Sequence, residues 1–234
     1  MGQKISPIGY RIGVFEEWKS RWYASKRDFA DTLIEDCKIR EFIQKDARLS
    51  KAGIPTVEIE RTRDEVKVMV HTARPGVIIG RKGEDVDLLQ NRLQEMTGRR
   101  INIKIVEIPR PDLDAQLVSE DVANQLERRA SFRRAMKRTA EQVMEAGAKG
   151  VKIHLAGRLA GSEMARRETV LMGSVPLSTL RAKISYGFSE AKTAQGHIGC
   201  KVWIHQGYYD MEGADGADAQ AGQVPQKPKR KSKR

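Results

Sequence analysis

The sequence predicts an α+β protein with two folded units, a short arm before them and a tail after them. The period of the apolar residues changes along the chain, from the 3.6 of a helix to the alternation of a strand and back. In the second half, two helical stretches precede four strand-like stretches, which is typical of helices packed on one face of a mostly antiparallel sheet. With 234 residues, the chain is long enough for each unit to bury its own core. We expect the arm at 1–16, folded units at 17–108 and 109–209, and the tail at 210–234.

The arm is basic and irregular. Its cations are Lys4 and Arg11, and its glycines together with Pro7 oppose regular structure. Gly2 and Ser6 match the short pattern for N-myristoylation, but the sequence shows no second membrane signal beside them. We therefore expect the arm to become ordered against a larger body rather than to anchor the chain.

The first helix of the first unit is predicted at residues 25–46. Ser25 is a candidate N-cap, and Phe29, Leu33 and Cys37 are spaced to fall on one face of the helix. This spacing indicates an apolar face through these three residues.

The rest of the first unit is predicted as a hairpin, a helix and a strand. TVEIERTRDEVKVMVHT at 56–72 alternates apolar and polar residues on both sides of a Thr-Arg-Asp turn. Residues 84–96 return to helical spacing, and Gly98 is a natural C-terminal stop. INIKIVEI at 101–108 is a further strand, closed by prolines.

The second unit is predicted to begin with helices at 112–129 and 131–146, the latter ending at Gly147. The strands follow in the sequences GVKIHLAGR, ETVLMGS, RAKISYGF and GCKVWIHQ. We expect two helices on one face of a mostly antiparallel four-stranded sheet.

The tail differs from the folded units in composition. DMEGADGADAQAGQ is acidic and made of small residues, whereas VPQKPKRKSKR carries six cations and no acid. Such a composition cannot form a core, so we expect residues 210–234 to be disordered.

Charge is the strongest global signal. The 43 Lys and Arg residues exceed the 31 Asp and Glu residues and give a net charge of +12. Polyanions are the expected partners, with nucleic acid ahead of anionic lipid. The sequence contains no apolar run near the roughly 20 residues that span a bilayer, so we expect no membrane partner.

The sequence shows no catalytic or metal-binding set. Cys37 and Cys200 lie far apart, which argues against a disulfide framework and fits a reducing, cytoplasmic setting. The four histidines are dispersed, and neither HExxH nor GxSxG occurs. We expect no catalytic residue, no metal and no cofactor.

A glycine-bounded pair of cations follows the apolar run at 77–79. Gly80, Arg81, Lys82 and Gly83 stand between a short segment and a predicted helix. Glycine allows a sugar-phosphate chain to approach the backbone closely, and the cations can contact phosphates. With a strand before it and a helix and strand after it, the loop matches the GxxG clamp of KH domains. The acidic start of the following helix suits the helix dipole but repels phosphate, and the Walker A pattern is absent.

SFRRAMKRTAEQV forms a second candidate site. On a helical projection, one side is apolar through Phe132, Met136, Ala140 and Val143. The other side carries four cations, namely Arg133, Arg134, Lys137 and Arg138. A solvated charged face is the alternative, but the scarcity of acids in this stretch favours a bound polyanion.

GRLAGSEMARRET is a third basic stretch, with Arg158, Arg166 and Arg167. The alternative is an ordinary strand connection, yet arginines suit phosphate contacts on folded RNA. Four aromatic residues could stack on bases, although we expect most of them to pack in the core: Trp18, Trp22, Tyr23 and Trp203.

Five blocks of the sequence resemble, in order, the signature blocks of the bacterial small-subunit ribosomal protein three family. They are MGQKISPIGYRIG, HTARPGVIIGRKGEDV, QLERRASFRRAMKR, GRLAGSEMARRE and VPLSTLRA, spread over residues 1 to about 207. Ala160 stands where the family's G-R-L-G-G pattern has its second glycine. The resemblance implies a type II KH domain at 17–108 and the family's C-terminal α+β domain at 109–209. It also implies binding in the head of the small subunit to ribosomal RNA and to neighbouring ribosomal proteins.

The resemblance further implies a role at the tunnel through which messenger RNA enters the small subunit. There the residues matching Arg133, Arg134 and Lys137 hold the incoming strand and help its duplexes to open, without nucleotide hydrolysis. It leaves open which RNA meets Arg81 and Lys82. Two other functions stay open from the residues: a free KH protein that acts on messenger outside the ribosome, and a nucleic-acid-cleaving or lyase enzyme.

Overall fold

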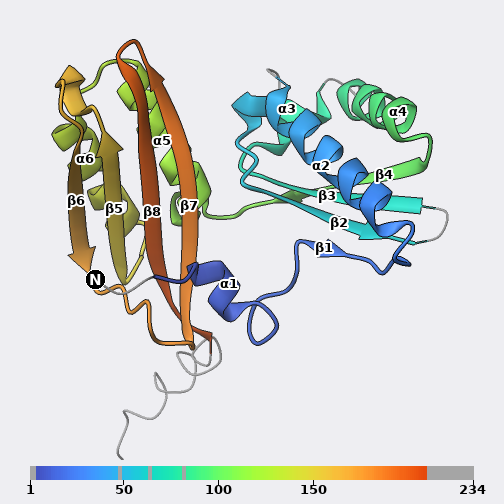
Figure 1. Cartoon of the computed structure of the whole chain (residues 1–234), viewed down its shortest axis with the longest axis horizontal. Helices are drawn as coiled ribbons and strands as arrows, with labels where there is room; N and C mark the ends of the chain where they lie inside the picture. The colour runs from blue at the N-terminus through green and yellow to red at the C-terminus, as the bar shows by residue number, and fades with distance from the viewer. Residues whose placement is uncertain (1–3, 47–48, 63–64, 81–82, 210–234) are drawn as a thin grey trace, which may run out of the picture.

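Two four-stranded sheets, each with helices on one face, make up the computed structural model (Figure 1). The structure describes residues 4–46, 49–62, 65–80 and 83–209. The tail predicted at 210–234 therefore lies outside the described residues.

The N-terminal sheet has the strand order β1-β2-β3-β4. β2 and β3 are antiparallel, whereas β1 pairs with β2 and β4 pairs with β3 in parallel. The predicted hairpin, the helix that ends at Gly98 and the strand after it are confirmed. The elements of this half are α1 (Pro7–Arg11), β1 (Ser20–Arg21), α2 (Phe29–Lys45), η1 (Leu49–Ala52), β2 (Thr56–Arg61), β3 (Glu65–Thr72), α3 (Pro75–Ile79), α4 (Glu84–Thr97) and β4 (Arg100–Glu107).

The face of α2 that packs on the sheet is not the predicted one. Phe29 and Leu33 are 49% and 46% exposed, and Cys37 is exposed as well. The buried side carries Thr32, Asp36, Ile39 and Ile43. The helix also begins later than predicted, at Phe29, and Ser25 donates a hydrogen bond to the Asp28 carboxylate instead of capping the helix. The apolar spacing was misleading because an acidic residue occupies the buried side.

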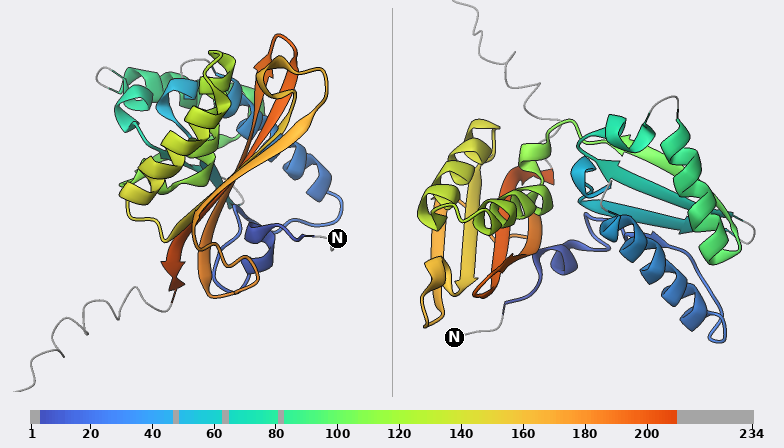
Figure 2. Two further views of the ribbon diagram at one scale, coloured as in Figure 1. Left: turned by 90° about the vertical axis from the view of Figure 1, so that its left-hand side faces the viewer. Right: turned by 90° about the horizontal axis from the view of Figure 1, so that it is seen from above.

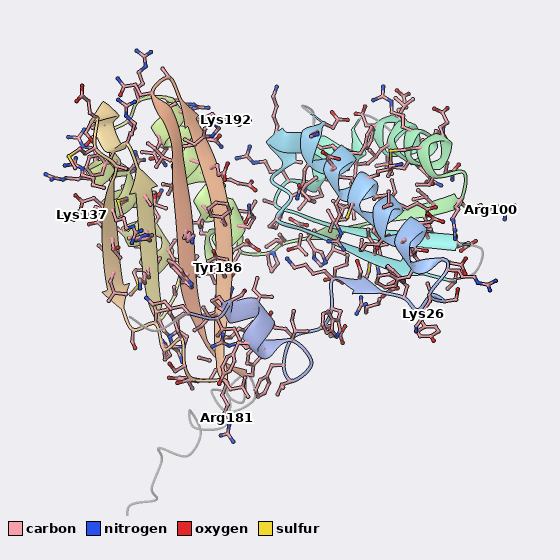
Figure 3. The ribbon with its side chains drawn as sticks, viewed as in Figure 1. Lys26, Arg100, Lys137, Arg181, Tyr186 and Lys192 are labelled. Atoms are coloured by element: carbon pink, nitrogen blue, oxygen red, sulfur yellow. The ribbon has the colours of Figure 1, made fainter. Side chains whose placement is uncertain are left out.

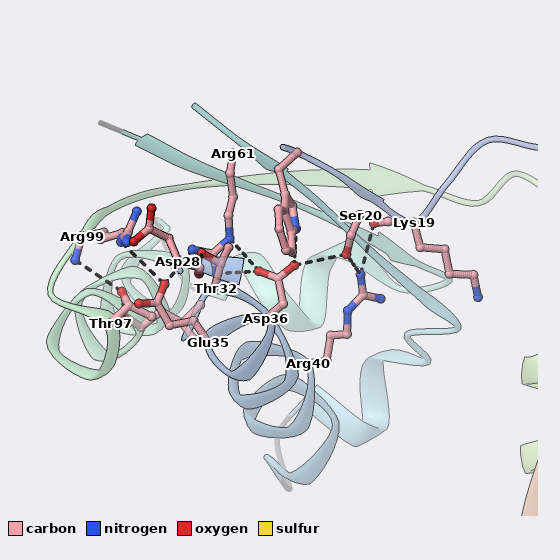
Figure 4. A network of polar contacts seen from close by, with 12 residues as sticks. Lys19, Ser20, Asp28, Thr32, Glu35, Asp36, Arg40, Arg61, Thr97 and Arg99 are labelled. Atoms are coloured by element: carbon pink, nitrogen blue, oxygen red, sulfur yellow. Dashed lines mark hydrogen bonds and ion pairs between the residues drawn. The ribbon is translucent and has the colours of Figure 1, made fainter. Parts of the chain in front are cut away.

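A network of polar contacts explains why that acidic residue is buried (Figure 4). Asp36 accepts hydrogen bonds from Nε of Arg61 at 2.7 Å, from Nε1 of Trp22 at 2.7 Å and from Oγ of Ser20 at 3.2 Å. The side chains of Asp36 and Arg61 are only 3% and 4% exposed. A buried charge is costly unless it is paired and hydrogen-bonded, and these contacts meet that need. They also fasten β1 and the residues after it to α2.

The C-terminal sheet has the order β6-β5-β8-β7 with all neighbours antiparallel. α5 and α6 cover one face of it, behind the strands in Figure 1 and beside them in the left view of Figure 2. The predicted two helices on a four-stranded antiparallel sheet are confirmed. The elements are η2 (Pro111–Leu113), α5 (Ala115–Glu127), α6 (Phe132–Glu145), β5 (Gly150–Gly157), η3 (Leu159–Gly161), β6 (Arg166–Gly173), β7 (Ala182–Thr193) and β8 (Gly196–Tyr208).

The start of α5 lies a few residues later than predicted because Asp114 caps it. The Asp114 carboxylate accepts hydrogen bonds from the backbone N–H groups of Gln116 and Leu117. Burial raises the pKa of Asp114, although the two amide hydrogen bonds act in the opposite direction. The short helix η2 occupies the residues before this cap.

The arm is ordered against the C-terminal unit of its own chain. α1 lies beside β7, and the ring of Phe15 stacks on that of Tyr209 with centroids 4.8 Å apart. The Tyr209 hydroxyl donates a hydrogen bond of 3.0 Å to Glu16. Residues at opposite ends of the described chain therefore meet. No helix among the described residues is both long and apolar enough to cross a bilayer.

Candidate nucleic-acid interface

The glycine-bounded loop joins α3 to α4 as predicted. Gly80 ends α3 with φ of 67°, and Gly83 precedes α4 with φ of 88°, both in the left-handed region that favours glycine. A β-carbon on Gly80 would overlap the carboxylate of Asp85, so a larger residue does not fit there. The predicted loop cations Arg81 and Lys82 lie outside the described residues.

The start of α4 is acidic. Its first turn carries Glu84, Asp85 and Asp87. These carboxylates suit the positive end of the helix dipole, but they oppose a phosphate at the same place. The described part of the loop thus permits a close backbone approach without supplying positive charge of its own.

Helix α6 places four cations on one exposed face. Its buried side holds Phe132, Ala135, Met136, Thr139, Ala140 and Val143, which confirms the predicted apolar side. Arg133, Arg134, Lys137 and Arg138 are all exposed. Lys137 has an exposed carboxylate, that of Glu141, 3.9 Å away, and Figure 3 shows Lys137 at the margin of the unit farthest from the N-terminal sheet. The side chains of Arg134 and Arg138 form no hydrogen bond or ion pair with any residue that the structure describes.

An aromatic ring connects two of the predicted basic stretches. The guanidinium carbon of Arg133 lies 5.6 Å from the centroid of the Phe132 ring, and that of Arg166 lies 5.3 Å from the same centroid. Arg166 opens β6, whereas Phe132 and Arg133 open α6. The structure therefore brings the α6 face and the third basic stretch together at this ring.

The other arginines of the third stretch have different environments. Arg167 is exposed on β6. Arg158 is held by the chain, since it donates hydrogen bonds to the carbonyl oxygens of Ser162 at 2.9 Å and Gln195 at 3.1 Å. Lys4, in the arm, is exposed. Of these three residues, Arg167 and Lys4 present their charge to solvent, and Arg158 organises the loop after β5.

Arg11 does not present its charge to RNA, in contrast to the prediction. The residue is fully buried. Its guanidinium donates hydrogen bonds to the carbonyl oxygens of Ala182 at 2.7 Å, Pro7 at 2.8 Å and Thr179 at 2.8 Å. Charge alone made it a candidate in the sequence, whereas the structure uses it to fasten the arm to β7.

Ala160 takes up the conformation of the glycine that the family pattern has at this position. Its φ of 54° and ψ of 26° are left-handed. For a residue with a β-carbon this conformation costs roughly 1–2 kcal/mol. The backbone path of the loop is thus compatible with the family pattern, with strain stored at one residue.

The aromatic residues are less buried than expected. Tyr23 is 98% exposed and Trp18 is 64% exposed. Trp22 is half-buried and hydrogen-bonded to Asp36, and Trp203 is half-buried on β8. The expectation of core packing is therefore wrong for Trp18 and Tyr23.

One group of basic residues, on the outer face of the C-terminal sheet, was not predicted from the sequence. Lys152 and His154 lie on β5, and Lys201 lies on β8 directly opposite His154. The pKa of His154 is lowered, first by partial burial and then by the positive charges of Lys201, Lys152, Arg167 and Lys4. Alternation along both strands is the signal that could have placed these residues on one face.

Metal-binding geometry is absent from the described residues, in which no three His, Cys, Asp or Glu side chains are grouped to hold an ion.

Two family models match the chain, one over each sheet. The model described as KH domain matches residues 38–113, and the model described as Ribosomal protein S3, C-terminal domain matches residues 122–204.

Known proteins are similar to nearly the whole chain. Small ribosomal subunit protein uS3 of Rhodopirellula baltica is 62% identical over 237 residues, which cover 100% of both chains. The protein of the same name from Desulforudis audaxviator is 55% identical over 207 residues, 88% of this chain and 94% of its own. That of Desulforamulus reducens is 49% identical over 223 residues, 95% of this chain and 100% of its own. The chain therefore belongs to the uS3 family of small ribosomal subunit proteins, which are RNA-binding structural components rather than enzymes.

Proposed function

We propose that the chain is a structural constituent of the small-subunit head on the cytoplasmic ribosome, where it binds ribosomal RNA and neighbouring ribosomal proteins. Its second role is to contact messenger RNA at the tunnel through which messenger enters, and to aid the unwinding of structured messenger there. Family membership and the net charge of +12 support the first role. The observation that carries the second is the exposed face of α6, where four cations stand on a helix whose other side is firmly packed.

The two units divide this work. We assign residues 17–108 to the KH unit, with Gly80, Arg81, Lys82 and Gly83 as its contact with ribosomal or messenger RNA. Residues 109–209 carry the α6 face and the third basic stretch. Lys4, Arg166 and Arg167 are the further candidates for ribosomal RNA, since their charges face solvent.

The mechanism of the α6 face is electrostatic. Arg133, Arg134, Lys137 and Arg138 follow one another along about one and a half turns, so they can contact successive phosphates of a single strand. Each phosphate contact adds roughly 0.7 to the salt dependence of single-strand binding and reads no sequence. The grip opposes re-annealing of a duplex while translocation supplies the work. No nucleotide needs to be hydrolysed by this chain.

The test uses ribosomes whose only copy of this chain carries Arg133→Ala, Arg134→Ala and Lys137→Ala. We expect translation of a messenger with a stable hairpin to slow more than that of an unstructured messenger of equal length. The matched control replaces three exposed cations of the N-terminal unit, Lys26, Arg27 and Lys38, with Ala. Equal slowing on both messengers, or the same hairpin defect in the control, would contradict the unwinding role.

Incorporation is tested separately by sedimentation of a lysate, followed by a high-salt wash of the ribosomal fractions. We expect one copy to remain per small subunit, because loose electrostatic passengers are released by salt. Release of the chain into the free fractions would instead favour a KH protein that acts outside the ribosome.

A further inference from the structure

The outer face of the C-terminal sheet presents cations beside aromatic rings. This is the face opposite α5 and α6, turned toward the viewer in Figures 1 and 3, where Tyr186 is labelled. Across the strands, Lys152 of β5 pairs with Trp203 of β8, and Trp203 pairs with Tyr186 of β7. The ammonium of Lys152 lies 5.4 Å from the Trp203 ring centroid, and the Trp203 and Tyr186 centroids are 5.4 Å apart.

A second row of the same kind lies beside the first. His154 of β5 pairs with Lys201 of β8, and Lys201 pairs with Phe188 of β7. The ammonium of Lys201 lies 5.9 Å from the Phe188 ring centroid, and Phe188 is 41% exposed. On the other side of His154, its Nδ1 is 2.8 Å from Oγ1 of Thr169 on β6. All four strands thus contribute to a surface of rings and positive charge.

The balance of charge on this face is positive. Its cations are Lys152, Lys201 and Arg167, with Lys4 of the arm near His154. Among the described residues on this face, a carboxylate is contributed by Glu190 of β7, at the rim. Its Oε2 lies 4.0 Å from Nδ1 of His197. Cross-strand pairs between side chains can stabilise a sheet. Neighbouring like charges destabilise it instead, so sheet stability alone does not explain these cations. The pKa of His154 is lowered first by partial burial and then by these neighbouring positive charges.

We infer that this face is a binding surface for an unpaired stretch of RNA, whose bases stack on Trp203 and Phe188 while its phosphates contact Lys152, Lys201 and Arg167. Stacking on rings tolerates any base, and neighbouring cations follow the backbone. A four-stranded sheet with ring-bearing central positions is a known way to hold single-stranded RNA in other folds. The inference rests on the proposed function, because it takes the chain to work on RNA, but it uses a surface other than α6.

The edge strand β6 makes the surface continuous with the α6 face. Arg166 and Arg167 are neighbours on this strand and point to opposite sides of the sheet. Arg166 lies over the Phe132 ring on the helix side of the sheet. Arg167 lies on the outer side, where its positive charge helps to lower the pKa of His154. One strand of RNA could therefore pass from one face to the other around this edge.

RNA fits this face better than an acidic protein segment. A peptide would gain from the lysines but would make no special use of the half-buried Trp203 ring and the exposed Phe188 ring set beside them. Backbone pairing with a peptide is also blocked at the centre of the face, since β5 and β8 are hydrogen-bonded on both sides.

The experiment uses the full chain carrying the three α6 alanines of the translation test together with Arg81→Ala and Lys82→Ala, so that neither the α6 face nor the glycine-bounded loop contributes its charge. The probe is a mixed-sequence single-stranded RNA of about ten nucleotides, a usual length for a stacking groove. In this background we expect Trp203→Leu to weaken binding by roughly 5- to 150-fold, the range that the loss of one stacked base gives. Trp203→Phe keeps a ring and should stay within about threefold of the parent.

The salt dependence of binding is a second readout. It does not require a substituted side chain to pack in place of Trp203. Lys152→Ala with Lys201→Ala should lower the slope of log affinity against log salt by about 1.4, since each phosphate contact contributes roughly 0.7. The control pair, Lys45→Ala with Lys51→Ala, removes the same charge from exposed positions of the N-terminal unit and should leave the slope unchanged.

Three results would overturn the inference: equal slopes for the two lysine pairs, equal binding by Trp203→Leu and its parent, or displacement of the RNA by polyglutamate that itself loses affinity in Trp203→Leu. The last result would assign the face to an acidic protein. Failure of the α6 proposal would appear in the hairpin experiment and would leave this binding intact, so the two outcomes are separable.

Discussion

The guanidinium groups of Arg133 and Arg166 lie over one aromatic ring, that of Phe132, although they come from different elements of the C-terminal unit. The ring orders two long side chains that would otherwise lose conformational freedom on binding RNA. A cation over a ring at an exposed site is worth about 0.5–1 kcal/mol. The α6 face is therefore partly preorganised by a residue that carries no charge.

Phe132→Leu tests this preorganisation. We expect single-stranded RNA to bind two- to fivefold more weakly, which corresponds to about 0.5–1 kcal/mol, with an unchanged salt slope because no charge is removed. Arg133→Ala is the comparison, and it should lower the slope by about 0.7. A reduced slope for Phe132→Leu would show that the ring acts in some other way.

Asp36→Ala tests the buried network of the N-terminal unit. Removing the carboxylate leaves the buried guanidinium of Arg61 with Glu35 as its remaining acidic partner, and leaves Trp22 and Ser20 without their acceptor. We expect the free energy of unfolding to fall by about 2 kcal/mol, as measured by urea denaturation, because the hydrogen bonds to a buried carboxylate are lost and their donors stay in the interior. Lys45→Ala, which breaks an exposed pair on the same helix, should leave the denaturation midpoint nearly unchanged. Equal effects of the two substitutions would contradict the role of Asp36.

Ala160→Gly should stabilise the chain. Glycine adopts the left-handed conformation at φ of 54° without the penalty that a β-carbon incurs. We expect a gain of about 1 kcal/mol in the free energy of unfolding, after the greater freedom of glycine in the unfolded chain is subtracted. Ala165→Gly lies in the same loop without a positive φ and should destabilise instead. A loss of stability in Ala160→Gly would mean that the backbone here is not left-handed in solution.

His154 gives the stability of the chain a pH dependence of defined sign. Its pKa is lowered in the folded state, so the unfolded chain binds the proton more readily. The stability that the neutral form of His154 contributes is fully present above the unfolded pKa near 6.5, and it is lost as pH falls below that value. We expect the difference in stability between the parent and His154→Gln to change between pH 8 and pH 5.5, to the disadvantage of the parent at the lower pH. A difference that is constant with pH would contradict the lowered pKa.

The fold could be predicted where local patterns decide it. The hairpin of β2 and β3, the helix that ends at Gly98 and the four strands of the second sheet follow from alternation, helical spacing and turn residues. The buried side of α2 could not be predicted in this way, because Asp36 is stabilised by Arg61, a residue distant in sequence.

In the candidate site, too, the features set by local sequence patterns could be predicted, and those set by distant residues could not. The exposed cations of α6 are evident from its period, since the apolar side opposite them is unambiguous. Arg11 was misjudged because its partners lie on another element, and nothing near it in sequence indicates burial. The outer sheet face was missed because it exists only when β5 and β8 are paired in register, which sets Lys152 beside Trp203.

Contact between messenger and α6 is measured most directly by locating messenger on this chain in programmed small subunits. A messenger with a single photoreactive 4-thiouridine downstream of the decoding site is crosslinked, and the labelled residues are identified by mass spectrometry. We expect label on the exposed side of α6, around Arg133, Arg134 and Lys137, and its loss in the triple alanine variant. Label confined to other surfaces, with α6 unmarked as the thiouridine is moved along the messenger, would contradict it.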